Sequence, residues 1–234
     1  MKVFLNSLKG VAVGLALLAI SFKANAIPFE VDITVDNSYA LFYGTQTTAT
    51  NFVGSDGNWP TVEHYAFDLP TNNYIYVVTQ SDLAVAQGFL AQFTNLITHE
   101  RFYSNDSQWQ VTATGRYGFA PYNSTSASFS ELNSQLALAN AGTNPSSGWV
   151  ATTAGNANGS APWGNLSSID SAARWSWYDS KKDGSDPTQG GFNHDEYLIF
   201  RINVGAQSVP EPSSILLFAL GLIGLGLSRR KYKA

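Results

Sequence analysis

The chain of 234 residues contains no cysteine, only one methionine and few basic side chains. Without cysteine, neither a disulfide framework nor a zinc site with thiolate ligands is available, so a stable fold must come from a packed core. Basic charge is scarcest between residues 27 and 209, where six Lys and Arg face sixteen Asp and Glu, a formal charge of −10. Nucleic acid and anionic lipid both require a basic surface. The composition therefore excludes such partners for this segment and is compatible with neutral glycans or divalent cations.

The N-terminus has the three parts of a secretory signal peptide. Two lysines accompany an apolar run over residues 10–22, which is too short for an ordinary membrane span, and Ala24 and Ala26 form an A-x-A cleavage site. A buried N-terminal helix is the alternative. We predict a signal peptide over residues 1–26, removed by signal peptidase so that Ile27 becomes the first residue of the mature protein.

The C-terminus combines prolines, an uncharged apolar stretch and a basic tail. Pro210, Glu211 and Pro212 lead into residues 209–228, which reach about the 20 residues of a transmembrane helix. The prolines keep the chain extended ahead of that helix and accessible to a protease. A basic tail remains cytoplasmic, so the residues before Pro210 lie outside, in agreement with the signal peptide.

The tail itself consists of Arg229, Arg230 and Lys231, with Lys233 beyond them. The order of proline pair, glycine-rich apolar stretch and basic tail resembles the PEP-CTERM sorting signal. The resemblance implies recognition by an exosortase, a membrane-embedded cysteine transpeptidase-like enzyme, with processing near Pro210, Glu211 and Pro212. It also implies a Gram-negative host that makes exopolysaccharide. The chain would be held in the inner membrane before processing and would then reach the cell surface or extracellular matrix. A permanent single-span anchor is the alternative.

Residues 27–208 are predicted to form one extracellular, all-β domain, and residues 209–234 the sorting signal. Residues 31–36 and 198–204 alternate apolar and polar side chains, and residues 74–78 are apolar on both faces, as in a central strand. Residues 130–141 predict one short helix. Short strands bounded by turns favour an antiparallel β-sandwich or jelly roll, flanked by the signal helix and the transmembrane helix.

Part of this domain resembles the closing half of galactose-binding-like sandwich domains in exported bacterial proteins. The resemblance rests on residues 172–177 followed by residues 196–201, with Pro162-Trp163-Gly164 and the turn at residues 80–82. It implies a fold and does not imply sugar binding, because a fold alone does not specify a ligand.

Three tryptophans, Trp59, Trp149 and Trp163, lie among turn residues and are possible ligand-binding side chains. Aromatic rings in the loops of a sandwich either stack on a sugar or cap the core, and the sequence leaves both open. We expect Trp109 in the core, together with either Trp175 or Trp177, because the alternation of side chains along a strand buries one of each neighbouring pair.

Four aspartates in one Gly- and Ser-rich region are candidate metal ligands: Asp179, Asp183, Asp186 and Asp195. Their oxygens are the ligands that calcium prefers, although the spacing does not match an EF-hand loop and Lys181 occupies a ligand position. A solvated acidic loop is the alternative. No other cofactor is predicted.

A secreted hydrolase is the main rival function, with His194 beside Asp195, or His64 beside Glu63, as the base. Neither a G-x-S-x-G nucleophile elbow nor an H-E-x-x-H motif is present. We therefore predict a non-catalytic binding or structural module with neutral carbohydrate, such as exopolysaccharide, as its partner. A calcium-dependent adhesion module is a further alternative.

Overall fold

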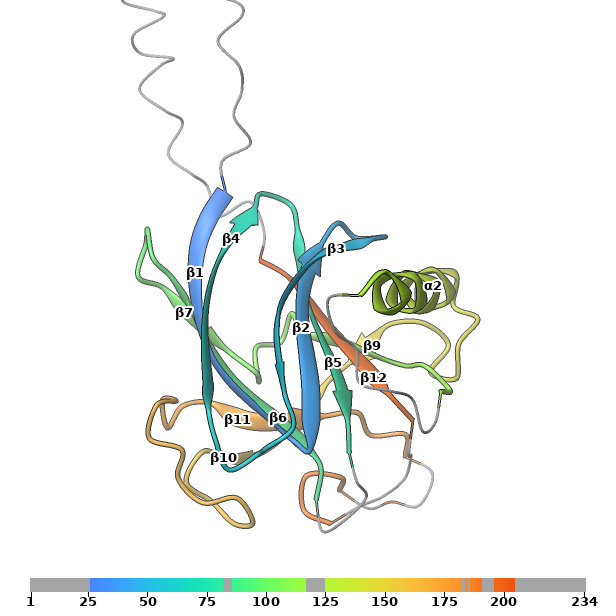
Figure 1. Cartoon of the computed structure of the whole chain (residues 1–234). Coiled ribbons are helices and arrows are strands. Elements are labelled where there is room, and N and C mark those ends of the chain that lie inside the picture. The colour runs from blue at the N-terminus through green and yellow to red at the C-terminus, as the bar shows by residue number, and fades with distance from the viewer. Residues whose placement is uncertain are drawn as a thin grey trace, which may run out of the picture.

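The computed structural model describes residues 26–81, 86–116, 125–181, 184, 186–190 and 196–204 (Figure 1). These residues form two six-stranded sheets and one helix. The predicted signal peptide up to residue 25 and the predicted transmembrane segment lie outside the described residues. Within the described ranges, no helix is long and apolar enough to cross a membrane.

The first sheet, sheet A, has the strand order β10-β11-β6-β1-β4, with β7 also paired to β6. Its strands are β1 (Ala26–Asp36), β4 (Glu63–Pro70), β6 (Gly88–Asn95), β7 (Arg101–Tyr103), β10 (Thr153–Ala157) and β11 (Arg174–Trp177). The second, sheet B, has the order β3-β2-β5-β12-β8-β9. Its strands are β2 (Ser38–Gly44), β3 (Ala49–Asp56), β5 (Tyr74–Gln80), β8 (Gln110–Ala113), β9 (Val150–Ala151) and β12 (Leu198–Asn203). All pairings between these strands are antiparallel, so the predicted mostly-β, antiparallel fold is confirmed.

The main core lies between the two sheets. On β1, alternation directs Val31, Ile33 and Val35 inward, and each is at most 1% exposed. From sheet B, Phe200 reaches across to Phe89 of sheet A, with ring centroids 4.9 Å apart. One buried cluster therefore joins residues of both sheets, and the sheets pack face to face.

Helix α2 (Ser126–Ala141) covers the outer face of sheet B (Figure 1). Thr125 caps its first turn by accepting a hydrogen bond from the Ser128 N–H, and Gly142 ends it with φ of 69°, a left-handed conformation that favours glycine. Leu132 and Leu136 of the helix belong to one buried cluster with side chains of sheet B. The predicted helix at residues 130–141 is confirmed and begins four residues earlier.

A third layer of loops covers the outer face of sheet A near β11. Trp163 stacks on Trp175 with ring centroids 3.9 Å apart, and both belong to a buried cluster with Leu90. Trp177 instead packs in the main core against Phe200. The expectation that only one of Trp175 and Trp177 is core is wrong: both are fully buried, because the loop layer covers a face that a two-layer sandwich would leave in water.

The two ends of the described domain emerge at the same end of the sheets (Figure 1). Ala26, the first residue of β1, pairs with Pro70, and Asn203, the last residue of β12, pairs with Tyr74. Pro70 and Tyr74 are the two ends of the short β4–β5 turn. We call this the terminal end of the domain, and it is where the candidate site lies.

Candidate ligand-binding site

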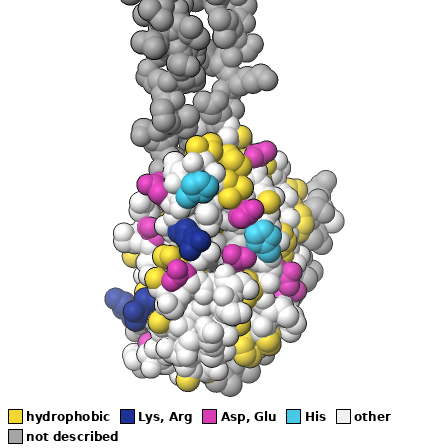
Figure 2. Space-filling view, turned by 90° about the vertical axis from the view of Figure 1, so that its left-hand side faces the viewer, with side chains coloured by type: hydrophobic (Ala, Val, Ile, Leu, Met, Phe, Trp, Pro, Cys, Tyr) yellow, Lys and Arg dark blue, Asp and Glu magenta, His cyan; other side chains and the backbone are white. Residues whose placement is uncertain are grey.

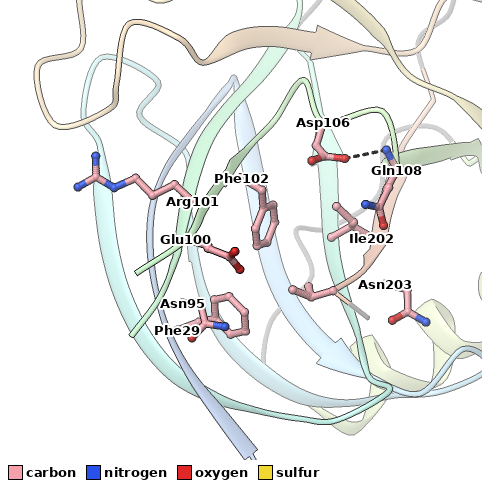
Figure 3. A pocket seen from close by; sticks show the side chains of 10 residues that line it. Phe29, Asn95, Glu100, Arg101, Phe102, Asp106, Gln108, Ile202 and Asn203 are labelled. Carbon is pink, nitrogen blue, oxygen red and sulfur yellow. Dashed lines mark hydrogen bonds between the residues drawn. The ribbon is translucent and has the colours of Figure 1, made fainter. Parts of the chain in front are cut away.

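A cleft of about 530 Å³ opens at the terminal end, between the β6–β7 hairpin and the end of β12 (Figure 3). Its lining combines aromatic and aliphatic side chains with planar polar ones. The lining residues are Phe29, Asn95, Glu100, Arg101, Phe102, Asp106, Gln108, Ile202, Asn203 and Val204. Because four separate segments of the chain supply them, the cleft exists only in the folded domain.

The apolar wall of the cleft is built on a cross-strand aromatic pair. Phe102 of β7 lies opposite Phe93 of β6, and the two rings stack with centroids 4.8 Å apart and planes 2° apart. Phe29 of β1 meets Phe102 edge to face, with centroids 6.0 Å apart. Since Phe93 covers one face of the Phe102 ring, the opposite face is the one available to the cleft.

The polar rim is carried by the turn between β7 and β8. The Asp106 carboxylate accepts a hydrogen bond from the Gln108 N–H over 2.8 Å, which holds the turn closed. Trp109, 1% exposed, anchors the turn in the core and donates its indole N–H to the Tyr103 carbonyl over 2.9 Å. The side chains of Asp106 and Gln108 are thus presented by a fixed backbone.

The β6–β7 turn supplies the second part of the rim. Asn95 is 4% exposed, and its side-chain Oδ1 accepts hydrogen bonds from the Ile97 and Thr98 N–H groups. Glu100 is exposed and lies at the other end of the turn, directly before β7. Arg101 extends away from the other lining side chains (Figure 3) and its guanidinium lies 3.8 Å from the Asp170 carboxylate.

This arrangement suits a ligand with an apolar face and several hydroxyl groups. The Phe102 ring offers an apolar surface, while Glu100, Asp106 and Gln108 offer acceptors and donors at the edge. None of the residues proposed from the sequence belongs to the lining set. A sequence signal did exist, since a polar D-x-Q turn immediately precedes a tryptophan predicted to be core, but nothing linked it to residues near the two ends of the domain.

Trp163 is a structural side chain in the folded domain. It is 6% exposed, stacks on Trp175 and donates its indole N–H to the Asp36 carboxylate over 2.6 Å. Trp175 covers one face of the Trp163 ring, and the low exposure of the whole side chain leaves no open face for a ligand. Trp59, half-buried, packs against the same loop layer, and its carbonyl accepts a hydrogen bond from the Thr34 hydroxyl over 2.8 Å.

Trp149 lies on the outer face of sheet B and stacks against a cation. The guanidinium carbon of Arg201 lies 3.7 Å from the centroid of the Trp149 ring and 5.2 Å from that of Tyr74. Arg201 donates to the side-chain carbonyls of Asn140 and Gln110, each over 2.9 Å. Burial lowers the pKa of Arg201. One face of the Trp149 ring is therefore occupied, and the structure does not bring Trp59, Trp149 and Trp163 together in one shared packing cluster.

Of the four candidate calcium ligands, Asp179 and Asp186 lie within the described residues, and Asp183 and Asp195 lie outside them. Asp186 accepts hydrogen bonds from the N–H and hydroxyl of Thr188 and from the Gln189 side chain. In the described part of the chain, no three His, Asp or Glu side chains converge as metal ligands. Calcium binding by the full set stays a prediction.

Neither of the described histidines, His64 and His99, lines the cleft. His99 lies in the β6–β7 turn, directly before the lining residue Glu100, and its N–H donates to the Asn95 backbone carbonyl over 2.8 Å. His64 is on the exposed outer face of sheet A, where its Nδ1 lies 3.0 Å from the Asp32 carboxylate. That face mixes histidine, acidic and basic side chains without an evident hollow (Figure 2). His194 is not among the described residues, so its proposed role with Asp195 stays a prediction.

Comparison with known proteins identifies the C-terminal segment. Residues 208–231 match the family model described as the PEP-CTERM protein-sorting motif, which confirms the resemblance inferred above. The motif implies an exported protein that an exosortase processes. No curated protein and no solved structure matches the chain. The likeness of the middle segment to galactose-binding-like domains therefore stays a prediction.

Proposed function

We propose that this protein acts at the cell surface or in the extracellular matrix of a Gram-negative bacterium, where its sandwich domain binds neutral carbohydrate without catalysis. The cleft at the terminal end carries the proposal, because it combines an aromatic face with polar side chains on a fixed turn. Signal peptidase would release the N-terminus and an exosortase the C-terminus near Pro210.

Neutral sugars fit this cleft on three grounds. Its volume of about 530 Å³ is within the range of small-molecule sites and accommodates one or two sugar rings. A sugar ring has an apolar face for Phe102 and hydroxyl groups for Glu100, Asp106 and Gln108. The formal charge of −10 between residues 27 and 209 repels acidic polymers and leaves neutral ones unaffected.

Binding is favoured over hydrolysis because no histidine or hydroxyl side chain lines the cleft. Glu100 and Asp106 are its two carboxylates, and a pair of carboxylates is also what a glycosidase uses. Hydrolysis is therefore an outcome that the test must register, by measuring new reducing ends.

The test uses the full chain in a detergent without a sugar headgroup, presented to an array of neutral glycans and to the exopolysaccharide of the host. Gln108→Ala removes an exposed side chain that lines the cleft, and Gln46→Ala, in the exposed β2–β3 turn, is the matched control. We expect binding that weakens about tenfold in Gln108→Ala, the loss of roughly one hydrogen bond, and stays unchanged in Gln46→Ala. Binding equal in both variants, or no neutral ligand at all, would refute the proposal; new reducing ends would refute its non-catalytic part.

A further inference from the structure

We infer that the cleft faces the membrane while the precursor is anchored, and that processing at the sorting motif opens it to extracellular polymers. This regulation rests on the proposed function, because it concerns access to the same site. It follows from where the cleft lies relative to the last residues of the domain.

The last described residues of the domain form one wall of the cleft. Ile202, Asn203 and Val204 line the cleft, and Val204 is the last residue described before the sorting motif, which matches from residue 208. On the opposite wall, Phe29 is only three residues from the start of β1. The opening of the cleft therefore lies beside the point where the chain departs toward the membrane.

The tether is too short to let the domain turn over. Ten residues lie between Val204 and Ile215, the first strongly apolar residue of the predicted span, and the eleven residue-to-residue steps that join them cover at most about 40 Å when fully extended. Strand β1 has 11 residues, so the sheets are about 36 Å long. To point the terminal end away from the membrane, the tether would have to run the whole length of the domain with almost no slack.

An exposed apolar tip stands beside the cleft at the same end. Leu96 and Ile97 are 37% and 56% exposed and lie in the β6–β7 turn, between the lining residues Asn95 and Glu100. The Leu96 N–H donates to the Pro28 carbonyl over 2.9 Å, which places this tip next to the start of β1. Hydrophobic side chains gather toward this end of the face in Figure 2.

The occupant that fits this tip is the membrane surface to which the chain is tethered. Two exposed aliphatic side chains gain free energy by entering the interfacial region of a bilayer, and the tether keeps them within reach of it. The acidic rim beside them, Glu100 and Asp106, disfavours anionic lipid, so the contact is with zwitterionic lipid. With the tip on the lipid surface, the cleft opening is covered by the same surface.

The absence of cysteine from the chain allows site-specific labels without background. In the chain from Ile27 to Ala234, reconstituted into phosphatidylcholine vesicles, a fluorophore on Ile97→Cys reports contact with spin-labelled lipid by quenching. Ser55→Cys, exposed on β3 toward the opposite end of the sheets, is the matched control. A protease site inserted after Gly205 releases the domain from the same vesicles.

We expect the label at position 97 to be quenched before release and not after, and the label at position 55 to be unquenched throughout. A bulky maleimide-polyethylene glycol reagent should modify Gln108→Cys at least tenfold more slowly before release, with no change for Ser55→Cys. Equal quenching at both positions, or equal modification of Gln108→Cys before and after release, would overturn the inference. Neither measurement uses a sugar, so these outcomes are independent of whether the glycan experiment succeeds.

Discussion

Replacing Asn158 by alanine should destabilise the domain strongly, because one side chain closes the loop that carries Trp163. Asn158 is 6% exposed, and its amide donates to the carbonyls of Leu166 over 3.0 Å and Ile169 over 2.6 Å. Its own carbonyl accepts from the Leu166 N–H over 2.9 Å. Among the described residues of this loop, Asn158 alone has a side chain that makes three hydrogen bonds across it.

The magnitude follows from these three bonds. Each contributes about 1 kcal/mol net, and removing the side chain also leaves buried backbone groups without a partner, at about 1–3 kcal/mol each. Allowing for partial rescue by water, we expect Asn158→Ala to lower the free energy of unfolding by about 3–5 kcal/mol. For a domain of this size, 1 kcal/mol shifts Tm by about 2–4 °C, so Tm should fall by roughly 10 °C.

Thermal unfolding followed by tryptophan fluorescence measures this shift. Asn156→Ala is the matched control, because Asn156 is the same residue type two positions earlier and donates one exposed hydrogen bond, to the Ala161 carbonyl over 3.0 Å. We expect that variant to lose less than about 1 kcal/mol. If both variants unfold within 2 °C of each other, the three bonds of Asn158 do not hold the loop in the way described.

Three further predictions follow from single features. Trp163→Phe keeps the stack on Trp175 but removes the donor to Asp36, and should cost about 1–3 kcal/mol in chemical denaturation without changing glycan binding. Burial raises the pKa of Tyr197 to about 12, whereas an unfolded tyrosine ionises near 10, so the unfolded state releases its proton first. The contribution of Tyr197 to stability is therefore constant below about pH 9, and Tm should fall between about pH 10 and 12. A constant Tm over that pH range would contradict this. Intact mass of the protein from host envelope and culture fractions should give a species from Ile27 to near Pro210, whereas retention of the basic tail would mean a permanent anchor.

The sequence predicted those elements whose periodicity extends over a whole element. Residues 31–36 lie in β1, residues 74–78 in β5 and residues 198–203 in β12, because one or both faces of each strand are continuously apolar. The short strands β9 and β10 were not predicted, since β9 is only Val-Ala and β10 is Thr-Ala-Gly-Asn-Ala, and neither carries an alternation of apolar and polar residues. Their pairing is decided by β8 and β11, which lie far away in the sequence.

The candidate site could not be predicted, because its residues are polar turn residues that meet only in the fold. Asn95 and Asn203 are the last residues of β6 and β12, and Asp106 lies in the turn after β7. Nothing in the sequence next to any of them indicates that the others are near. The sequence pointed to the loop tryptophans instead. In the structure Trp163 is buried, because an aromatic ring in a loop segment packs inward when a second loop layer is available to receive it.

The most direct test of the account locates the sugar on the protein. Hydrogen–deuterium exchange of the full chain, in detergent without a sugar headgroup, is compared with and without the neutral exopolysaccharide of the host. The account predicts slower exchange in peptides covering residues 95–109 and the end of β12, and unchanged exchange around Trp59 and Trp149. Protection confined to the tryptophan segments, with residues 95–109 unaffected, would contradict the assignment of the cleft as the binding site.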